Sequence, residues 1–502
     1  MKLKELCKNM KIEITNDVEI TGITSNSREV KAGYMFIALK GAHNDGYTFI
    51  SDAISKGANA IVSDKDFQRE FQGAKLLVND TYSFSLDAAP AFYNYPSKKL
   101  NLIGITGTNG KTTISYLLES IYSEHKHKTG VMGTISYRIL NHEEAAINTT
   151  PQAVELQRVL SDMVSVGVET VCMEVSSHAL ALDRVRGTEF DVAIFTNLTQ
   201  DHLDFHKTMD EYLLAKKILF DNVGMNNKRY KKAAVINGDD PYSLKIAADT
   251  KAPVITYGGK KDYDVHFKDV EYSMTGIKGV LVFKNAGELL FEANLIGKHN
   301  MYNICGAAAA AYAQGVAINE IGRGISALKA VPGRCEVIKE GQNFTCIIDY
   351  AHTEDALRNI LSIAKSFKPK KIITVFGCGG NRDRNKRPVM GQVAVVNSDY
   401  VIVTSDNPRD EDPLRIALDI ELGIKRIAHN NYEVIIDREE AIRKAIHMAG
   451  KDDVVVIAGK GHEKYQIIKE KKFHFDDRET SRRVIRGILS NNDDMLLFND
   501  KK

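Results

Sequence analysis

Short apolar runs alternate with amphipathic segments along most of this 502-residue chain. The runs have the length and the valine and isoleucine content of buried strands, and the segments between them carry apolar residues at helical spacing. We expect strands over 102–106, 170–175, 192–196, 233–237, 371–376, 400–404 and 453–458, and helices over 114–122 and 209–220. Because strands and helices alternate, the pattern predicts α/β domains with mostly parallel sheets.

The chain is too long for a single hydrophobic core, since domains usually hold about 100–200 residues. A polar stretch with a proline, 94–99, precedes a predicted strand and indicates one boundary. Pro332 and Gly333 indicate a second, because they follow an amphipathic helix. The alanine-rich run 306–313 just before that helix predicts a closely packed helix. We therefore expect three domains, over 1–98, 99–331 and 332–502.

The overall composition is that of an ordinary globular protein, with 43% hydrophobic and 26% charged residues. Its 67 basic and 65 acidic residues give a formal net charge of +2, which gives no reason to expect a nucleic acid or a membrane surface as partner. The six cysteines form no Cys-x-x-Cys pair, and we interpret them as reduced core residues. Without a long apolar run or a signal-like N-terminus, we expect a cytoplasmic protein with no membrane segment.

A glycine-rich segment, Gly104-Ile105-Thr106-Gly107-Thr108-Asn109-Gly110-Lys111-Thr112-Thr113, follows a predicted strand and opens a predicted helix. In this context the backbone N–H groups and the helix N-terminus can bind phosphate oxygens. Lys111 can reach the β- and γ-phosphates, and the Thr112 hydroxyl can bind Mg²⁺. The spacing differs from the common phosphate loop, since Ile105 stands where the first glycine belongs and Gly107 serves instead.

A phosphate loop alone indicates a nucleotide and no particular reaction. Glu174 ends a predicted parallel strand, at the edge where ligands bind, and suits an Mg²⁺ ligand. Asp201 and His202 follow another predicted strand and lie where a second metal or a phosphate could bind. Lys216 lies on a predicted helix beside a second lysine, and its chemistry alone does not distinguish it from a solvated surface lysine.

These residues resemble the Mur ligase family of ATP-dependent peptide ligases in peptidoglycan assembly. The resemblance runs from Asn26-Ser27-Arg28 to Asp476-Asp477-Arg478-Glu479, which is nearly the whole chain. The motifs that carry it are Gly107 to Thr112, Glu174 before Ser176-Ser177-His178, Asp201-His202-Leu203-Asp204, Gly297-Lys298-His299-Asn300 with Asn303, and Asp349-Tyr350-Ala351-His352.

The resemblance implies a UDP-binding N-terminal domain, a central ATPase domain with a phosphate-loop parallel sheet, and a Rossmann-like C-terminal domain. It implies ATP as a substrate, bound by the segment from Gly107 to Thr113 together with Asn300, Arg334 and Asp349. Thr112, Glu174 and His202 would hold Mg²⁺. Lys216 would carry a CO₂-derived carbamate that helps to hold a second Mg²⁺. Lys111, Lys216 and His202 would therefore be the catalytic residues.

Within the family, the N-terminal pattern is most similar to that of the members that add the third residue of the peptide. The substrate would then be UDP-N-acetylmuramoyl-L-alanyl-D-glutamate (UDP-MurNAc-L-Ala-D-Glu). The residues implied to bind it are Ser27, His43, Asn148, Thr149, Thr150, Ser176 and Arg184. Some members carry a glutamine where this chain has Leu182, and many have a proline after the histidine that corresponds to His352, where this chain has Thr353. We expect a monomer.

The segment Asp406-Asn407-Pro408-Arg409 resembles the signature of members that add meso-diaminopimelate. Arg382, Gly459 and Glu463 match further contacts to this amino acid. Its side chain ends in an ammonium and a carboxylate. An arginine can bind the carboxylate through two hydrogen bonds, while Glu463 can bind the ammonium. A lysine substrate lacks the distal carboxylate and would leave an arginine unpaired.

Three other functions remain open from the sequence. One is a different ligase of the superfamily, such as a folylpolyglutamate synthetase or the ligase that adds D-Ala-D-Ala. A second is a tripeptide synthetase that adds lysine, which Arg409 disfavours. A third is a nucleotide-switched binding protein without ligase chemistry, which would leave Glu174, His202 and the C-terminal arginines unexplained.

Overall fold

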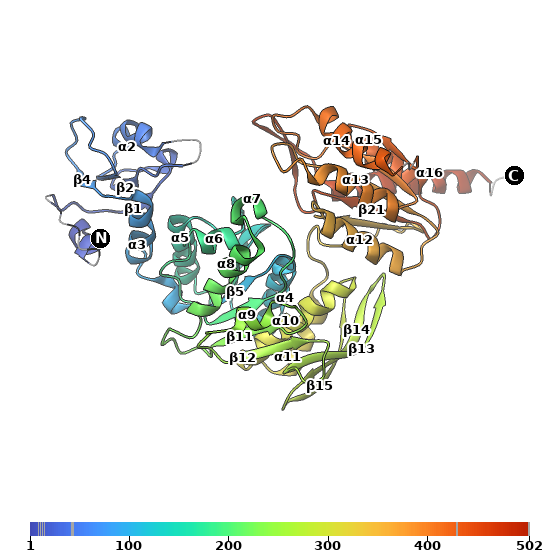
Figure 1. The fold of residues 1–502 in the computed structure, drawn as a ribbon, viewed down its shortest axis with the longest axis horizontal. Coiled ribbons are helices and arrows are strands. Elements are labelled where there is room, and N and C mark those ends of the chain that lie inside the picture. Colours follow the sequence, from blue (N-terminus) through green and yellow to red (C-terminus); the bar gives the residue numbers. More distant parts are fainter. Residues whose placement is uncertain are drawn as a thin grey trace. The chain divides into compact units, whose positions relative to one another are not determined.

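The computed structural model describes residues 1–8, 10, 12, 14, 16–41, 45–427 and 430–499, and only the backbone of 491–499. Figure 1 shows the helices and strands of the chain, which divides into two compact units. The first comprises Met1–Lys268, Val280–Phe291 and Tyr302–Ala327. The second comprises Asp269–Gly279, Glu292–Met301 and Leu328–Lys502.

The first unit begins with a four-stranded parallel sheet of order β1-β2-β3-β4. Its strands are Gly22–Thr24, Tyr34–Ile37, Ala60–Ser63 and Ala74–Leu77. The helices around it are α1 (Leu3–Lys8), α2 (Ile50–Ser55) and α3 (Thr81–Phe92), with 3-10 turns η1 (Ser27–Glu29), η2 (Gly46–Phe49) and η3 (Pro96–Lys99). One face of the sheet packs on α1 and α3, where Leu3, Leu6, Phe84 and Ala88 are buried.

A larger sheet follows, with the strand order β15-β14-β13-β12-β11-β10-β5-β9-β6-β7-β8. Its strands are β5 (Asn101–Thr106), β6 (Thr129–Met132), β7 (Ser136–Ile139), β8 (His142–Ala145), β9 (Thr170–Glu174), β10 (Val192–Phe195), β11 (Ala233–Asn237), β12 (Val254–Gly258), β13 (Val265–Ser273), β14 (Gly276–Phe283) and β15 (Gly287–Ala293). The helices are α4 (Lys111–Glu124), α5 (Ala153–Ser165), α6 (Ser177–Ala181), α7 (Leu203–His206), α8 (Met209–Asn222), α9 (Ser243–Ala247), α10 (Lys298–Gln314) and α11 (Ile318–Ala327).

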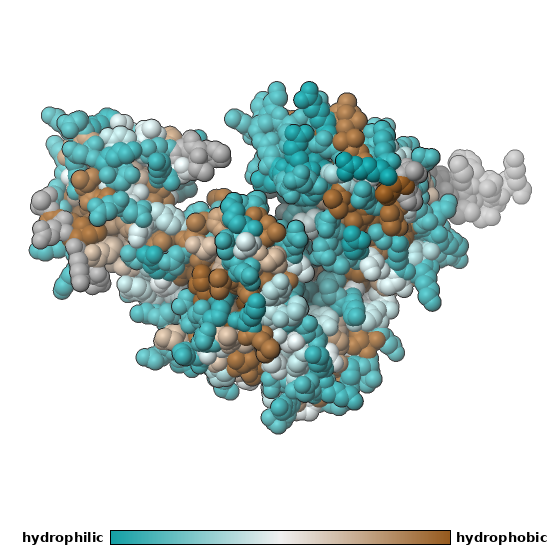
Figure 2. Space-filling view, in the orientation of Figure 1, coloured by the Kyte–Doolittle hydropathy of each residue, from teal (hydrophilic) through white to brown (hydrophobic). Residues whose placement is uncertain are grey.

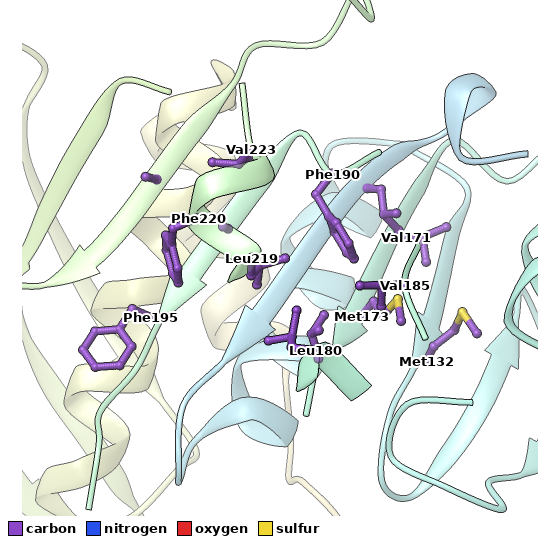
Figure 3. Close-up of a cluster of buried hydrophobic side chains, with 14 of the residues drawn as sticks. Met132, Val171, Met173, Leu180, Val185, Phe190, Phe195, Leu219, Phe220 and Val223 are labelled. Carbon is purple, nitrogen blue, oxygen red and sulfur yellow. The ribbon is translucent and has the colours of Figure 1, made fainter. Parts of the chain in front are cut away.

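Strand β5 lies in the middle of this sheet and is parallel to both of its neighbours, β9 and β10. The carboxyl ends of all three strands therefore meet at one edge, where ligands bind in open α/β sheets. Next to this edge, one hydrophobic core joins the strands to helix α8. Figure 3 shows Val171 and Met173 of β9, Phe195 of β10 and the α8 residues Leu219 and Phe220 in one buried cluster. Phe195 and Phe220 pack edge to face with ring centroids 6.4 Å apart.

The second unit contains a six-stranded sheet of order β16-β17-β21-β18-β19-β20. Its strands are Glu336–Ile338, Thr345–Asp349, Ile372–Phe376, Tyr400–Val403, Tyr432–Val434 and Val454–Ala458, numbered β16 to β21 in chain order. All pairs are parallel except that of β16 with β17. A hairpin of β22 (Tyr465–Ile468) and β23 (Lys471–His474) follows. The helices are α12 (Glu354–Ser366), α13 (Lys386–Asn397), α14 (Pro413–Arg426), α15 (Arg438–Met448) and α16 (Asp477–Asn499).

Helices cover both faces of this sheet, as the alternation of its buried residues requires. Ile347 of β17 belongs to the cluster with α12, α13 and α14, whereas its neighbour Ile348 belongs to the cluster with α15 and α16. This doubly covered sheet is the Rossmann-like arrangement that the resemblance implied.

The predicted elements are confirmed within one residue at the strand ends, and the predicted α/β class is confirmed. The helix expected over 306–313 lies inside α10, where Ala307 to Ala311 are fully buried. All six cysteines are buried and reduced. Polar side chains cover most of the face drawn in Figure 2, and apolar residues form separate patches. No helix in the described part of the chain is long and apolar enough to cross a membrane.

Candidate functional site

The phosphate loop lies between the end of β5 and the start of α4, as its sequence predicted. Gly107 has a φ of +144°, and a Cβ there would lie 1.8 Å from the Thr196 hydroxyl oxygen, so no other residue fits without displacing the Thr196 side chain. The end of β10 also holds the tip of the loop. Thr196 Oγ1 donates to the Asn109 carbonyl at 2.6 Å, and Asn197 Oδ1 accepts from the Asn109 N–H at 3.0 Å.

Helix α4 begins at Lys111 directly after Gly110, so its first N–H groups face the loop. The Lys111 ammonium donates to the carbonyl oxygens of Gly107 and Thr108, at 2.7 and 2.9 Å. It is therefore folded across the loop, within reach of any phosphate bound there. Thr113, the other residue expected at the phosphates, is buried in the first turn of α4.

Glu174, at the end of β9, is joined to the phosphate loop by a buried hydrogen-bond network. Thr112 Oγ1 donates to Glu174 Oε2 at 3.1 Å, and Thr134 donates to both carboxylate oxygens, through its N–H at 2.9 Å and its hydroxyl at 2.9 Å. A Cβ at Gly133 would lie 2.2 Å from Glu174 Oε1, so only glycine lets the carboxylate occupy this position. No sequence motif pointed to Thr134.

Lys216, which the sequence could not distinguish from a surface lysine, is 1% exposed on α8. No carboxylate of the described residues lies within ion-pair distance of its ammonium, which instead lies 4.3 Å from the centre of the Tyr212 ring. Burial, and then the charge of Lys111, hold the Lys216 pKa well below its usual value. The Tyr212 hydroxyl lies 3.2 Å from Thr108 Oγ1, which ties Lys216 to the phosphate loop.

His202 precedes α7 with a φ of +53°, an uncommon conformation for a residue other than glycine. Its Nε2 lies 3.4 Å from Asp201 Oδ2, and its ring meets the ring of His178 at 4.8 Å. Partial burial lowers the pKa of His202, which favours the neutral imidazole that metals require. Within the described part of the chain, no three His, Cys, Asp or Glu side chains converge as a preformed metal site.

Four of the residues expected to bind the peptide substrate form one hydrogen-bonded group near Glu174. Thr150 Oγ1 donates to the Glu174 carbonyl at 2.9 Å and accepts from the Ser176 N–H at 2.9 Å. The Arg184 Nη1 donates to the Thr150 carbonyl at 3.3 Å, while its buried Nε has no hydrogen-bond partner among the described residues. Thr149 Oγ1 lies 3.1 Å from Thr134 Oγ1.

The other expected peptide-site residues that the structure describes make hydrogen bonds outside this group. The Asn148 carbonyl accepts from the Tyr137 hydroxyl at 2.6 Å. Ser27 is buried in η1, beside the four-stranded sheet, and its carbonyl accepts from the Lys56 ammonium at 2.9 Å. His43 lies outside the described residues.

In the second unit, the loop Asp406-Asn407-Pro408-Arg409 follows β19. Arg409 has a φ of +50°, and its N–H and carbonyl are held by the backbone of Ile467 and Lys469 at 3.0 and 2.7 Å. Such strain persists only where the surroundings enforce it, and it is common at ligand sites. A Cβ at Gly379 would lie 3.0 Å from Arg409 Nη1 and 3.7 Å from Arg382 Cγ, so the two arginines flank the same glycine.

The loop after β21 brings Gly459 and Glu463 to the same place. A Cβ at Gly459, where φ is +114°, would lie 2.7 Å from Asp406 Oδ2. Glu463 Oε2 accepts from Asn407 Nδ2 at 2.8 Å and from the Lys460 ammonium at 3.0 Å. The structure therefore brings together all the residues expected to bind the amino acid, and it adds the fully buried Lys460, which the motif had not singled out.

Arg438 is a second residue that the sequence motifs did not indicate, and its hydrogen bonds support both loops. Arg438, at the start of α15, is fully buried in an ion pair with Asp477 at 2.8 Å. It also donates to the carbonyls of Ser405 at 3.3 Å and Ala458 at 3.0 Å, which directly precede the two loops. Only the spatial adjacency of β19 and β21 to α15 and α16 reveals this role.

The expected ATP contacts of the second unit lie around the end of β17. The Asp349 carboxylate accepts from the N–H groups of Cys335 and Ala351 at 2.7 and 2.8 Å, while burial raises its pKa. The Arg334 guanidinium lies 4.7 Å from the Tyr350 ring centre, a stacked position that suits a flat cation. Asn300, in the first turn of α10, donates to the Ile296 carbonyl at 2.7 Å.

A phosphate loop beside a buried glutamate and a buried lysine, together with a Rossmann-like unit that carries charged side chains in the loops after β19 and β21, is typical of a nucleotide-using α/β enzyme. Family models agree. The Mur ligase middle domain matches residues 105–311, the Mur ligase glutamate ligase domain matches 333–461, and the Mur ligase catalytic domain matches 19–90. The chain therefore belongs to the Mur ligase family, and it is an ATP-dependent ligase.

Individual relatives match over nearly the full length. The UDP-N-acetylmuramoyl-L-alanyl-D-glutamate--2,6-diaminopimelate ligase of Bacillus cereus is 46% identical over 474 residues, which are 94% of this chain and 95% of the relative. The ligase of the same name from Solibacter usitatus is 44% identical over 471 residues, 93% of this chain and 94% of the relative.

Solved structures agree on the fold. A UDP-N-acetylmuramoyl-L-alanyl-D-glutamate--2,6-diaminopimelate ligase matches with a TM-score of 0.66 and 34% identity, over 97% of this chain and 99% of that chain. The MurF ligase of Thermotoga maritima, solved in complex with ADP, matches with a TM-score of 0.64 and 20% identity, over 93% of this chain and 96% of that chain. At that identity, the second match bears on the fold alone.

Proposed function

We propose that this protein uses ATP to join meso-2,6-diaminopimelate to the D-glutamate of UDP-MurNAc-L-Ala-D-Glu, a step of peptidoglycan precursor synthesis. The observation that carries this proposal is Arg409, held in a strained conformation at the end of the Asp-Asn-Pro-Arg loop and joined there by Arg382 and Glu463. This arrangement suits a side chain that ends in a carboxylate and an ammonium. The proposal is supported by relatives matched over nearly their full length, which are named UDP-N-acetylmuramoyl-L-alanyl-D-glutamate--2,6-diaminopimelate ligase.

The reaction needs an activated carboxyl group. The γ-carboxylate of the D-glutamate attacks the γ-phosphorus of ATP in line, and ADP leaves as an acyl phosphate forms. The diaminopimelate amine then attacks the acyl carbon, phosphate leaves, and the amine loses one proton. Lys111 neutralises charge that develops on the phosphoryl oxygens, so its catalytic role is electrostatic. Positioning supplies the remainder, because no protein nucleophile is required.

ATP would lie along the phosphate loop, with its phosphates on the N–H groups of residues 107–113. Asn300, Arg334 and Asp349 would contact it from the second unit. The Tyr350 ring and the Arg334 guanidinium stack at 4.7 Å and offer flat faces to a purine.

The residues around Glu174 fit Mg²⁺, because hydroxyl and carboxylate oxygens are the ligands this ion prefers. Thr112, Glu174 and His202 would hold it, and Lys216, as its carbamate, would help to hold a second Mg²⁺. The ion would neutralise phosphate charge and orient the γ-phosphate. Lys216 suits carbamate formation because its amine is buried, no carboxylate of the described residues pairs with it, and its pKa is low, so the neutral nucleophilic form is populated. The amine would attack CO₂ and release one proton.

The carbamate can be tested separately from the ligase reaction. Protein equilibrated with ¹³C-bicarbonate should show one carbamate carbon resonance that Lys216→Arg abolishes, while Lys217→Arg, on the neighbouring and more exposed lysine, keeps it. The absence of a resonance that depends on Lys216 would refute the modification. The same samples should lose phosphate release when CO₂ is removed.

The UDP-linked dipeptide would be bound by Ser27, His43, Asn148, Thr149, Thr150, Ser176 and Arg184. The buried Nε of Arg184, which no described residue accepts from, supports this assignment, because a buried guanidinium nitrogen without an acceptor is costly and a substrate carboxylate or amide would satisfy it. The amino acid would be bound by Arg382, Asp406, Asn407, Pro408, Arg409, Gly459 and Glu463.

The organisation of the molecule follows the same proposal. Residues 1–98 would bind the UDP sugar, 99–331 would carry ATP chemistry and 332–502 would bind the amino acid. We place the reaction in the cytoplasm, where ATP and UDP-linked sugars are available, and expect a monomer to be active.

The decisive experiment combines purified protein, Mg-ATP and UDP-MurNAc-L-Ala-D-Glu with meso-diaminopimelate, L-lysine or no amino acid. Phosphate release and the product mass are followed. We expect release with diaminopimelate and a mass gain of one diaminopimelate residue. Release with lysine alone would overturn the reading of Arg409. No release with either amino acid would refute the proposed reaction.

A further inference from the structure

Lys460 is one of the largest fully buried side chains in the second unit. A lysine is rarely placed so deeply unless its charge is paired, because desolvation of an ammonium is costly. Its ammonium donates to Glu463 Oε2 at 3.0 Å and to Asn407 Oδ1 at 3.1 Å, and these are its hydrogen-bond partners among the described residues. Both partners belong to the expected amino-acid site, so Lys460 is bonded to that site from within the core.

The three side chains form a closed ring of hydrogen bonds. Asn407 Oδ1 accepts from Lys460 and from the Ile467 N–H at 2.9 Å, which fixes the amide so that Nδ2 faces Glu463 at 2.8 Å. Glu463 Oε2 thus accepts two hydrogen bonds, from Asn407 and from Lys460. The other, Oε1, has no hydrogen-bond partner among the described residues and is left to accept from a ligand.

This ring also sets the charge that a ligand meets. With Lys460 in place, the charge of Glu463 is largely compensated, so an ammonium alone gains little from approaching Oε1. A ligand must add a carboxylate for Arg409 to gain a second charge-assisted bond. Without Lys460, Glu463 would attract any ammonium more strongly and would repel the neighbouring carboxylate of a zwitterion.

We propose that Lys460 is a positioning residue that gives this site its preference for an amino acid whose distal end carries both an ammonium and a carboxylate. The inference rests on the proposed function, since it concerns the choice of amino acid in that reaction. It assigns to Lys460 an action through Glu463 and Asn407, without contact to the substrate.

The test compares two variants of Lys460 with a matched control. Lys460→Gln removes the charge and keeps a hydrogen-bond donor, whereas Lys460→Met removes both. Lys464→Met removes a lysine of the same loop region that is exposed. For each protein, kcat/KM is measured by phosphate release with meso-diaminopimelate and with L-lysine, and KM is measured for ATP. Melting temperatures establish that each variant is folded.

We expect the ratio of kcat/KM for diaminopimelate over lysine to fall roughly tenfold or more in both Lys460 variants, the effect of one charge-assisted bond. KM for ATP should stay within about twofold, because the changed charge-assisted bond lies at the amino-acid site. Lys464→Met should keep the wild-type ratio. If the Lys460 variants fold and keep the wild-type ratio, or lose both amino acids equally, Lys460 has only a structural role and the inference is wrong.

A second variant decides the matter if neither Lys460 variant folds. Glu463→Gln leaves the Lys460 charge uncompensated, so the site should then favour a carboxylate and the ratio should rise. An unchanged or lower ratio would overturn the inference. Failure of the proposed function looks different, because the wild-type protein itself would then release no phosphate with either amino acid.

Discussion

Replacing Glu174 by glutamine removes one charge from the nucleotide site and leaves its shape almost unchanged. The carboxylate is 1% exposed and accepts three hydrogen bonds, one from the Thr134 N–H and two from the hydroxyls of Thr112 and Thr134. A glutamine keeps the first through its oxygen. Its NH₂ group must donate where Oε2 accepted, which the two hydroxyls permit by rotating. Thr134 can still donate to Thr149, 3.1 Å away.

The cost to stability is therefore the difference between charged and neutral hydrogen bonds at two hydroxyls. A bond to a charged group contributes about 1.5–3 kcal/mol and a neutral one about 1 kcal/mol, and relief from burying a carboxylate offsets part of the difference. We expect the free energy of unfolding to fall by no more than about 2 kcal/mol. Phosphate release should fall roughly 100- to 1,000-fold, the cost of losing one electrostatic group at a reacting centre.

The assay measures substrate-dependent phosphate release over a range of Mg²⁺ concentrations, together with urea unfolding. The matched control is Glu169→Gln, an exposed glutamate just before the same strand. A Glu174→Gln protein that keeps near-normal turnover and the wild-type Mg²⁺ dependence would refute the role of Glu174. A variant that unfolds at low urea would show instead that the network is mainly structural.

Three further outcomes follow from the geometry. Lys111→Ala should reduce phosphate release at least about 100-fold with an unchanged melting temperature, because the positive charge that Lys111 places over the loop is lost, and near-normal turnover would rule this role out. Asp477→Asn should lower the free energy of unfolding by about 3–5 kcal/mol, since Arg438 is left buried without its counter-charge; a loss below about 1 kcal/mol in urea would contradict the pair's importance. Burial, and then the charge of Arg334, lower the pKa of His462 from 6.5 to about 3. Between about pH 6.5 and pH 3, His462 is therefore protonated in the unfolded chain and neutral in the folded one. The free energy of unfolding falls as the pH drops through this range. His462→Gln should make this fall less steep in denaturation series, and equal slopes would contradict the shift.

The phosphate loop illustrates what local sequence can predict. Strand β5, the glycines and helix α4 are consecutive in the chain, so their spacing alone places Lys111 and Thr112 at the start of a helix. The same holds for Glu174 at the end of β9, because a carboxylate after an apolar run marks a strand end wherever the strand lies in the sheet. The α/β class and the reduced, buried cysteines follow from such local patterns too.

Lys216 shows where that reasoning ends. Two adjacent lysines on a helix look alike in sequence, and only the packing of α8 buries Lys216 over Tyr212 while Lys217 reaches Asp221 at the surface. Lys460 was passed over for a similar reason. Its partners Asn407 and Glu463 come from two loops that meet because β19 and β21 both flank β18 in the sheet.

The sequence by itself thus determined the elements, the α/β class and the residues whose chemistry depends on near neighbours in the chain. The tertiary structure decided which charges are buried together, as in the pairs of Lys460 with Glu463 and Arg438 with Asp477. The physical reason is that desolvation depends on everything packed around a group. A side chain's charge state and role are therefore set by residues that can lie anywhere in the sequence.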